Sequence, residues 1–174
     1  MSAKLKLYPP DWVSAEEGAY LLNVAESTFR DTFGGMNSPE NMNRHCRANF
    51  SEDLQAAEIA NPNMLTLLSE EGKKPISFVQ LRWGHAPDCV VGQFPGEIHR
   101  LYVANDWHGK GIAQELMNAS IAEMKARGSE VIWLGVWERN PRAIAFYSKF
   151  GFVEVGEHIF AVGNDPQRDI ILAR

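Results

Sequence analysis

The stretch that decides the fold covers residues 97–113 and reads EIHRLYVANDWHGKGIA. Residues 97–103 combine β-branched, aromatic and leucine side chains with polar ones, which is typical of a strand. From Gly109 to about Arg127 apolar side chains recur at helical spacing, and Gly128 ends the pattern. The stretch therefore predicts a strand that leads through a glycine-rich turn into an amphipathic helix.

The turn between this strand and this helix has the chemistry of an anion-binding site. The first backbone N–H groups of a helix have no partner within the helix, and the helix dipole is positive at that end. Gly109 and Gly111 carry no Cβ, so the backbone can approach an anion closely, and the small Ala113 lets the helix pack tightly. The turn can therefore hold a phosphate, although a glycine-containing connection without a ligand is the simpler interpretation of one short motif.

Two common nucleotide-binding motifs do not fit this turn. A Walker A loop needs Ser or Thr after Gly-Lys, whereas Gly111 follows Gly109-Lys110 here. A Rossmann fingerprint needs a third small residue where Gln114 stands. A phosphate held at this turn must belong to another class of ligand.

Before residue 97 the sequence predicts a short strand, three helices and an antiparallel pair of strands. Residues 4–8 alternate polar and apolar side chains and stop at Pro9-Pro10. Helix-start signals follow at Ser14, Ser38 and Ser51. Two β-rich runs flank a turn at residues 71–74, namely 64–68 and 76–81. Residues 84–96 contain Pro87, Gly92 and Pro95 and predict a loop.

After residue 128 the sequence predicts alternating strands and helices. Residues 131–136 form a dense apolar strand, and Asn140-Pro141 caps a helix that runs to about Phe150. Two last strands are expected at 152–162 and 168–172. The whole order indicates one α/β domain over residues 1–174, built on a mixed sheet with antiparallel and parallel parts.

Composition disfavours several classes of protein. No run approaches the roughly 18 apolar residues that span a bilayer, and residues 1–8 lack a signal-peptide pattern, so we expect a cytoplasmic protein without a membrane partner. The formal charge of −5 disfavours non-specific binding of nucleic acid and is compatible with a cationic substrate. Cys46 and Cys89 lack zinc-site spacing, so we expect free thiols and no metal. Homodimers are common among soluble proteins, and the sequence leaves the oligomeric state open.

Three segments at matching separations resemble the acetyl-CoA signature of the GNAT superfamily of N-acetyltransferases: residues 97–103, 108–113 and 140–152. The family pattern is Gln or Arg, two residues, Gly, one residue, then Gly or Ala. Gly111 and Ala113 match it, whereas His108 stands in place of Gln or Arg. The resemblance implies a mixed, mostly antiparallel central sheet flanked by helices, with acetyl-CoA as co-substrate. The departure at His108 leaves the backbone contacts to the diphosphate unaffected but removes the usual side chain.

The resemblance also implies a reaction. Residues 28–41 and 160–169 are more loosely similar to bacterial spermidine/spermine N-acetyltransferases. We therefore expect transfer of acetyl from the thioester to a small-molecule primary amine, with a polyamine as the leading candidate. A protein N-terminus or lysine as acceptor, and a non-catalytic CoA-sensing module, are the alternatives. The presence of both Tyr147 and Glu97 argues against the sensing module.

Three residues are the candidate catalytic groups. By resemblance Tyr147 occupies the general-acid position, and its phenol, with an ordinary pKa near about 10, suits protonation of a thiolate. Glu97 resembles the strand glutamate that histone acetyltransferases of the superfamily use as base. His99 lies two residues further along the strand and has an ordinary pKa near about 6.5, so it is the second candidate. A chain of water molecules in place of one dedicated base stays open.

The resemblance also assigns the co-substrate contacts. Backbone groups of Leu101, Tyr102 and Val103 are expected to bond the pantetheine arm like an added strand. The diphosphate is expected on the turn: His108, Gly109, Lys110, Gly111, Ile112 and Ala113. Asn140 is expected near the pantetheine, besides its simpler role as helix cap. For Arg142, solvation is favoured over a phosphate contact.

The acceptor pocket is expected between the amino-terminal helices and the loop at 84–96. Asp31, Glu40 and Asp88 are candidates for negative charge there, although surface solvation is the favoured role of each. The tryptophans beside the predicted sheet are expected to be core residues: Trp107, Trp133 and Trp137.

Overall fold

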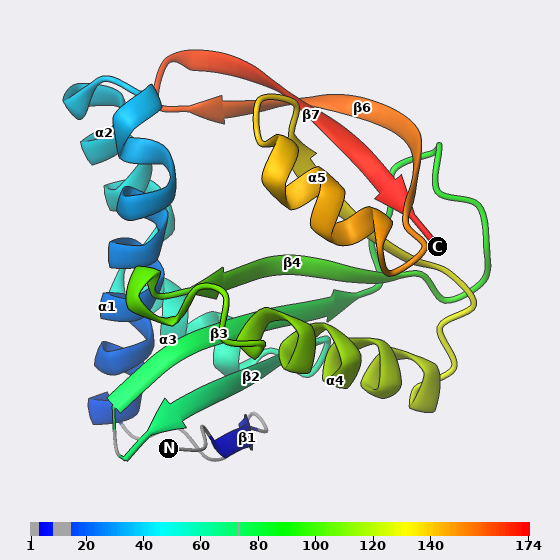
Figure 1. The fold of residues 1–174 in the computed structure, drawn as a ribbon, viewed down its shortest axis with the longest axis horizontal. Coiled ribbons are helices and arrows are strands. Elements are labelled where there is room, and N and C mark those ends of the chain that lie inside the picture. The colour runs from blue at the N-terminus through cyan, green and yellow to red at the C-terminus, as the bar shows by residue number, and fades with distance from the viewer. Residues whose placement is uncertain (1–3, 9–14, 73) are drawn as a thin grey trace.

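A seven-stranded sheet forms the centre of the molecule, with the strand order β1-β2-β3-β4-β5-β7-β6 (Figure 1). The computed structural model describes residues 4–8, 15–72 and 74–174. Its strands are β1 (Lys4–Tyr8), β2 (Met64–Glu71), β3 (Lys74–Trp83), β4 (Gly96–Val103), β5 (Ile132–Trp137), β6 (Val153–Val162) and β7 (Asp165–Ala173). Neighbouring strands run antiparallel, except β4 and β5, which run parallel. The predicted mixed, mostly antiparallel α/β sheet is therefore confirmed.

The helices of the described residues are α1 (Ala15–Phe33), α2 (Pro39–Asn49), α3 (Glu52–Ala60), α4 (Ile112–Ala126) and α5 (Pro141–Ser148). Helices α2, α3 and α5 begin at the capping residues that the sequence predicts. Ser38 accepts a hydrogen bond from the amide of Asn41, and Ser51 accepts one from the amide of Leu54. The signals at Ser14 and at Pro9-Pro10 lie outside the described residues. In the ranges that the structure describes, no helix is both long and apolar enough to cross a bilayer.

Helix α4 begins three residues later than the sequence predicts. Gly109 and Gly111 have φ angles of +76° and +85°, which a right-handed helix does not contain. A short 3-10 helix at Asn105–Trp107 and this turn therefore connect β4 to α4. Glycine at both positions gives the turn a conformation that other residues rarely adopt.

The two faces of the sheet are covered by different helices. Apolar side chains of α4 and α5 pack with Leu67, Val79 and Leu134 in one hydrophobic core. Apolar side chains of α1, α2 and α3 pack with Leu68 and Phe78 in a second core on the opposite face. We call these the α4 face and the α1 face. The alternation of Leu67 with Leu68, and of Phe78 with Val79, follows from the two-residue period of a strand.

The parallel strands β4 and β5 pair over only two positions, Gly96 with Ile132 and Glu97 with Trp133. Beyond them, His99 opposes no residue of β3, because Arg100 pairs with Gln80 and Ile98 with Leu81. Such a β-bulge bends the strand that carries it. The two halves of the sheet therefore spread apart from this point, as Figure 1 shows between β4 and the β6–β7 pair.

Candidate active site

A cavity of about 310 Å³ lies where β4 and β5 diverge. Its walls come from both faces of the sheet, from Phe29 and Phe33 of α1 to Phe146 and Tyr147 of α5. We call it the central cavity. Because one continuous space touches helices on opposite faces, the gap between the strands connects the α1 face to the α4 face.

The central cavity brings together eight of the predicted site residues: His99, Leu101, Tyr102, Val103, His108, Ala113, Asn140 and Tyr147. Five others lie outside its lining: Glu97, Gly109, Lys110, Gly111 and Ile112. Ile112 is buried and packs in the core of the α4 face. The Lys110 ammonium lies over the ring of Trp107, 4.4 Å from its centroid. Lys110 thus has a cation–π partner within the turn itself.

The turn before α4 leaves room for an anion. Gly111 is the N-cap of the 15-residue helix α4, and no side chain caps the first amides. A Cβ built on Gly109 would meet nothing within 4 Å, and one on Gly111 would meet only Gln114 Oε1, at 3.9 Å. Open space and uncapped amides at a helix N-terminus are the features that a diphosphate needs, so the residues present fit that group.

His108 joins the turn to β4 and to α5. Its Nε2 lies 2.8 Å from the carbonyl oxygen of Val103, which can only accept, so Nε2 carries the hydrogen. In the neutral ring Nδ1 is then an acceptor, and Arg142 donates to it over 3.3 Å. His108 therefore holds the turn in position through its own hydrogen bonds, where the family pattern has Gln or Arg.

The cavity-facing edge of β4 has no ladder partner beyond Glu97, because β5 has already diverged. The partly buried side chains of Leu101 and Val103 pack against the core of the α4 face. Tyr102 packs on the α1 face against Phe78 and Phe29. An extended chain of peptide-like groups can add to such a free edge as a strand does.

Asn140 and Tyr147 belong to the α5 wall of the central cavity. The side-chain oxygen of Asn140 accepts a hydrogen bond of 3.2 Å from the amide of Ala143, so its predicted role as cap is confirmed. The Tyr147 ring contacts Phe146 and Phe152 edge-on. Burial raises the pKa of Tyr147 to about 12. Its phenol therefore keeps its proton throughout the neutral range.

Glu97 is 5% exposed and does not line the central cavity, whereas its neighbour His99 does. Arg82 donates two hydrogen bonds to its carboxylate, and His99 Nδ1 lies 3.4 Å from its Oε1. Burial opposes ionisation, but the hydrogen bonds from His99 and Arg82 outweigh it and hold the pKa of Glu97 below its usual range. Glu97 is therefore a fixed negative charge, and His99 is the member of the pair that reaches the cavity.

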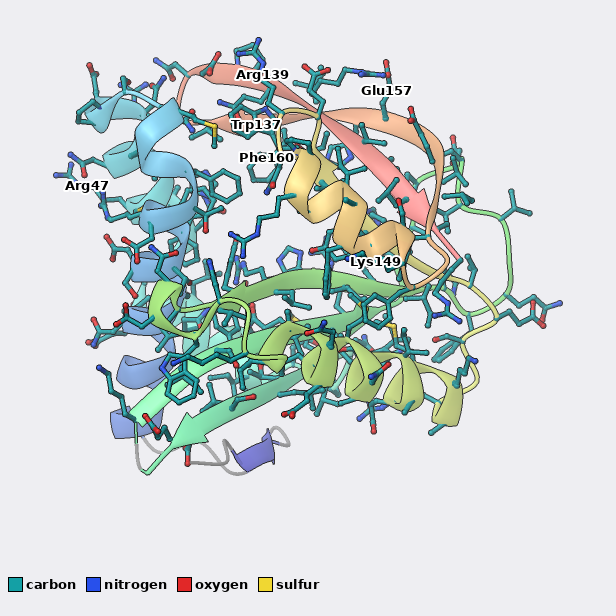
Figure 2. The ribbon with its side chains drawn as sticks, viewed as in Figure 1. Arg47, Trp137, Arg139, Lys149, Glu157 and Phe160 are labelled. Atoms are coloured by element: carbon teal, nitrogen blue, oxygen red, sulfur yellow. The ribbon has the colours of Figure 1, made fainter. Side chains whose placement is uncertain are left out.

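The α1 side of the cavity is aromatic. Its rings are Phe29, Phe33, Tyr102, Trp137 and Phe160. Trp137 and Phe33 lie 6.0 Å apart, and Figure 2 shows Trp137 and Phe160 near the start of α5. Trp133 and Trp137 are both buried, as expected. Trp137 also forms part of the wall of the central cavity.

The expectation that the loop at 84–96 forms part of the acceptor pocket is wrong. Val90 of this loop packs on Val131, Trp133 and Ile171, and none of residues 84–96 lines the central cavity. Residues of strands β6 and β7 line the central cavity instead of this loop. None of the candidate acids of the sequence, Asp31, Glu40 and Asp88, lines the cavity. The carboxylate that does is Asp169 of β7, which sequence reasoning missed.

Hydrogen bonds join the β6–β7 hairpin to the start of α2 at the far end of the α1 side of the central cavity. Gln167 of β7 donates a hydrogen bond of 2.6 Å to Asn37, which precedes α2. Asn41 of α2 accepts one of 3.4 Å from the amide of Asn164 in the β6–β7 turn. A Cβ on Gly163 in the same turn would meet the Asn41 backbone at 2.8 Å. The β6–β7 hairpin and the start of α2 therefore close on each other beside the cavity.

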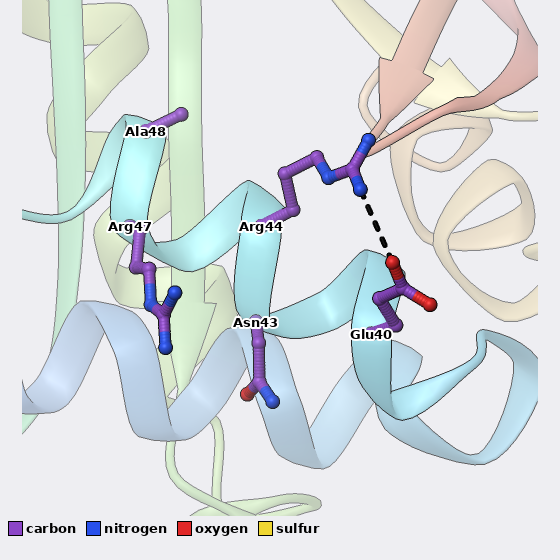
Figure 3. Close-up of a pocket in the computed structure, with 5 residues that line it drawn as sticks. All are labelled: Glu40, Asn43, Arg44, Arg47 and Ala48. Carbon is purple, nitrogen blue, oxygen red and sulfur yellow. Dashed lines mark hydrogen bonds and ion pairs between the residues drawn. The ribbon is translucent and has the colours of Figure 1, made fainter.

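A second depression lies on the outer surface of α2 (Figure 3). Its lining comes from this one helix: Glu40, Asn43, Arg44, Arg47 and Ala48. All five are exposed, and Glu40 is paired with Arg44 at 3.2 Å. A hollow on the outside of one helix cannot surround a ligand, so the central cavity is the candidate active site.

Comparisons with known proteins show the family and the relatives of this chain. Residues 23–152 match the acetyltransferase (GNAT) family. An uncharacterized N-acetyltransferase of Lactobacillus delbrueckii subsp. lactis is 32% identical over 164 residues, which cover 93% of this chain and 94% of the relative. The PaiA N-acetyltransferase of Thermoplasma acidophilum, solved in complex with coenzyme A, superposes with a TM-score of 0.77 at 23% identity, covering 100% of this chain and 99% of that one. The Escherichia coli ribosomal-protein-S18-alanine N-acetyltransferase superposes with a TM-score of 0.67 at 17% identity, covering 98% and 92%.

Proposed function

Because this chain belongs to the acetyltransferase (GNAT) family, we propose that it transfers the acetyl group of acetyl-CoA to a primary amine of a small, positively charged molecule, with polyamines as the leading candidates. The observation that carries the proposal is the central cavity itself. It has Tyr147 on the α4 side, and aromatic rings with one carboxylate on the α1 side. An activated acyl group and a cationic amine can meet there from opposite faces.

The α4 side would hold acetyl-CoA, which supplies a thioester that an amine can attack. The uncapped amides around Gly109 to Ala113 would bind the diphosphate. The free edge of β4 at Leu101 to Val103 would bind the pantetheine. Arg142 lies beside His108 at the cavity wall, so it is a further candidate for a phosphate contact.

His99 is the proposed base. Because the Glu97 carboxylate can only accept, the His99 nitrogen facing it carries the hydrogen, and Nε2 is left with a lone pair. Nε2 takes the proton that the ammonium group must lose before its nitrogen can attack. Glu97 is the positioning residue that fixes this tautomer and stabilises the charged ring.

Tyr147 is the proposed acid. The amine nitrogen forms its bond to the acetyl carbon, the carbon–sulfur bond breaks, and the departing thiolate takes up the phenolic proton of Tyr147. The nitrogen then still carries one proton more than a neutral amide, and this proton passes through water to the Tyr147 phenolate, which restores the acid. A pKa of about 12 means that Tyr147 is protonated before every turnover and readily regains its proton afterwards.

The bridge between Asn37 and Gln167 favours a small acceptor over a protein chain. An extended peptide lying across the α1 side would run into the contacts that Asn41 makes with the β6–β7 turn. A short amine needs only the space beside the aromatic rings.

The test is a panel of acceptors with acetyl-CoA, read by release of the CoA thiol. The panel contains butylamine, butane-1,4-diamine, spermidine and short peptides with a free N-terminus. We expect release with the small amines and little with the peptides. Release with peptides alone would instead support a protein N-terminal acetyltransferase. Binding of CoA without release for any amine would support a sensing module.

A further inference from the structure

Asp169 is a buried carboxylate with no partner of its own. It is 9% exposed, and within the described residues no hydrogen bond or ion pair reaches it. The other carboxylates near the cavity are satisfied by arginines, Glu97 by Arg82 and Glu58 by Arg100. Burial of an unpaired carboxylate is costly, and a positively charged ligand beside Asp169 would offset that cost.

Asp169 lines the central cavity, and its Oδ2 lies 3.4 Å from the position that a Cβ of Gly135 would take. The ring of His158 borders the same position, with its Cε1 at 3.1 Å. Gly135 is solvent-exposed although it lies in the middle of strand β5. Because Gly135 has no side chain, the space beside the Asp169 carboxylate and the His158 ring stays free.

The groups around Asp169 suit a cation. Its ladder partner on β5 is Trp137, whose ring lies 6.0 Å from that of Phe33. Aromatic faces attract ammonium groups. The ionisable groups that interact with Asp169 are His158, its ladder partner on β6, and Tyr102 of β4. The nearby positive charge of Arg100 is already engaged by Glu58 and Gln80.

We propose that Asp169 is the residue that binds the ammonium group of the acceptor and selects cationic amines over neutral molecules of the same size. This inference rests on the proposed function, because it names the group that recognises the acceptor of that same reaction. The ammonium donates hydrogen bonds to the carboxylate, and the aromatic rings beside it cover the attached carbon chain.

The titration of Asp169 gives the proposal a pH signature. Burial raises the pKa of Asp169 to about 6, and His158 limits the rise. The carboxylate is therefore charged at neutral pH and is neutralised as the pH falls through about 6. Binding of an ammonium ion should weaken over that range.

A binding experiment without turnover tests the proposal. The protein saturated with CoA is titrated calorimetrically with butylamine, which is protonated at neutral pH, and with butan-1-ol as the neutral probe of similar size. We expect butylamine to bind and butan-1-ol to bind far more weakly. In Asp169→Asn the affinity for butylamine should fall about 10- to 100-fold, the usual range for a hydrogen bond to a charged group.

Kinetics separate this role from a merely structural one. Asp169→Asn should raise KM for the amine by the same factor, leave KM for acetyl-CoA unchanged and change kcat by less than about threefold. The rise of KM for the amine below pH 6 should disappear in this variant and return in Asp169→Glu. Glu154→Gln, which removes a negative charge from an exposed position on β6, is the matched control and should behave like the parent protein.

Two results would overturn the proposal: an Asp169→Asn variant that keeps the parent affinity for butylamine, or equal binding of butan-1-ol by the parent protein. Failure of the proposed function looks different. In that case the parent protein binds butylamine through Asp169 but releases no CoA thiol with any amine.

Discussion

His99 and Glu97 lie side by side on β4, with Nδ1 of the imidazole 3.4 Å from Oε1 of the carboxylate. The two-residue period of a strand places both side chains on one face of β4. The bulge at His99 lies just where the pairing of β4 with β5 ends, and His99 lines the cavity at that point.

His99→Ala should reduce kcat/KM about 100-fold or more, because a positioned base contributes a factor of that order. Added imidazole should restore part of the activity, whereas the affinity for CoA should not change. Glu97→Gln should cause a smaller loss, because the ring stays but its orientation and charge are less well supported. Steady-state rates over a range of pH measure the effect of each of these two substitutions. An unchanged rate in His99→Ala would mean that water or another residue acts as the base.

Tyr147→Phe should lower kcat strongly while the dissociation constant for CoA stays the same. The phenylalanine ring keeps the edge-on contacts with Phe146 and Phe152, so the fold should be preserved. Turnover measured by thiol release, together with calorimetric titration of CoA, separates the two effects. If kcat is retained, Tyr147 is not the acid.

Gly111→Val should weaken CoA binding at least about 10-fold, because a branched side chain at a φ of +85° distorts the turn and fills the approach to the amides. Gly128→Val is the matched control. Gly128 follows α4 at its other end, has a φ of +89° and lies in open space, so its replacement costs similar backbone strain. The control should lose stability and keep its affinity for CoA. Equal loss of CoA binding in both variants would contradict the assignment of the turn.

Asp169→Asn should make the protein more stable at neutral pH. The folded state raises the pKa of Asp169 from its usual 3.8 to about 6, so it binds the proton more tightly than the unfolded state does. The stabilisation from that proton is complete below the unfolded value and is lost as the pH rises through about 6. Above this range the buried charge costs up to about 3 kcal/mol, which asparagine avoids.

Urea unfolding at about pH 8 and at about pH 4 checks this difference in the free energy of unfolding. The gain of Asp169→Asn over the parent protein should be present at the higher pH and nearly absent at the lower one. A variant that is less stable than the parent at the higher pH would show that the carboxylate has a stabilising partner.

Asn37→Ala should widen the range of acceptors. It removes the hydrogen bond of 2.6 Å from Gln167 and so loosens the bridge between the start of α2 and the β6–β7 hairpin. We expect the ratio of kcat/KM for a short peptide amine to that for butane-1,4-diamine to rise. The loss of stability should be near about 1 kcal/mol, as for one hydrogen bond. An unchanged ratio would mean that another barrier excludes peptides.

Much of the fold could be predicted because its signals are local. Serine caps, glycine turns and alternating strands each occupy a few neighbouring residues, and Ser38, Ser51 and Asn140 cap helices where expected. Helix α4 begins later than the sequence predicts because Gly109 and Gly111 adopt positive φ angles, and the pattern of side chains does not reveal backbone angles. The cytoplasmic location and a homodimer stay predictions.

The acceptor side could not be predicted because it depends on pairings between distant strands. Asp169 stands beside two isoleucines near the end of the chain, and nothing there marks it as buried. Its burial comes from ladder pairing with Trp137 on one side and His158 on the other. The loop at 84–96 was misplaced for the same reason, since its contact with Ile171 of β7 depends on that register.

The divergence of β4 and β5 lets the central cavity reach helices on both faces of the sheet. Two reactants that enter from opposite directions can be present together, and neither has to withdraw to admit the other. Direct transfer within a ternary complex then needs no acetylated protein as an intermediate.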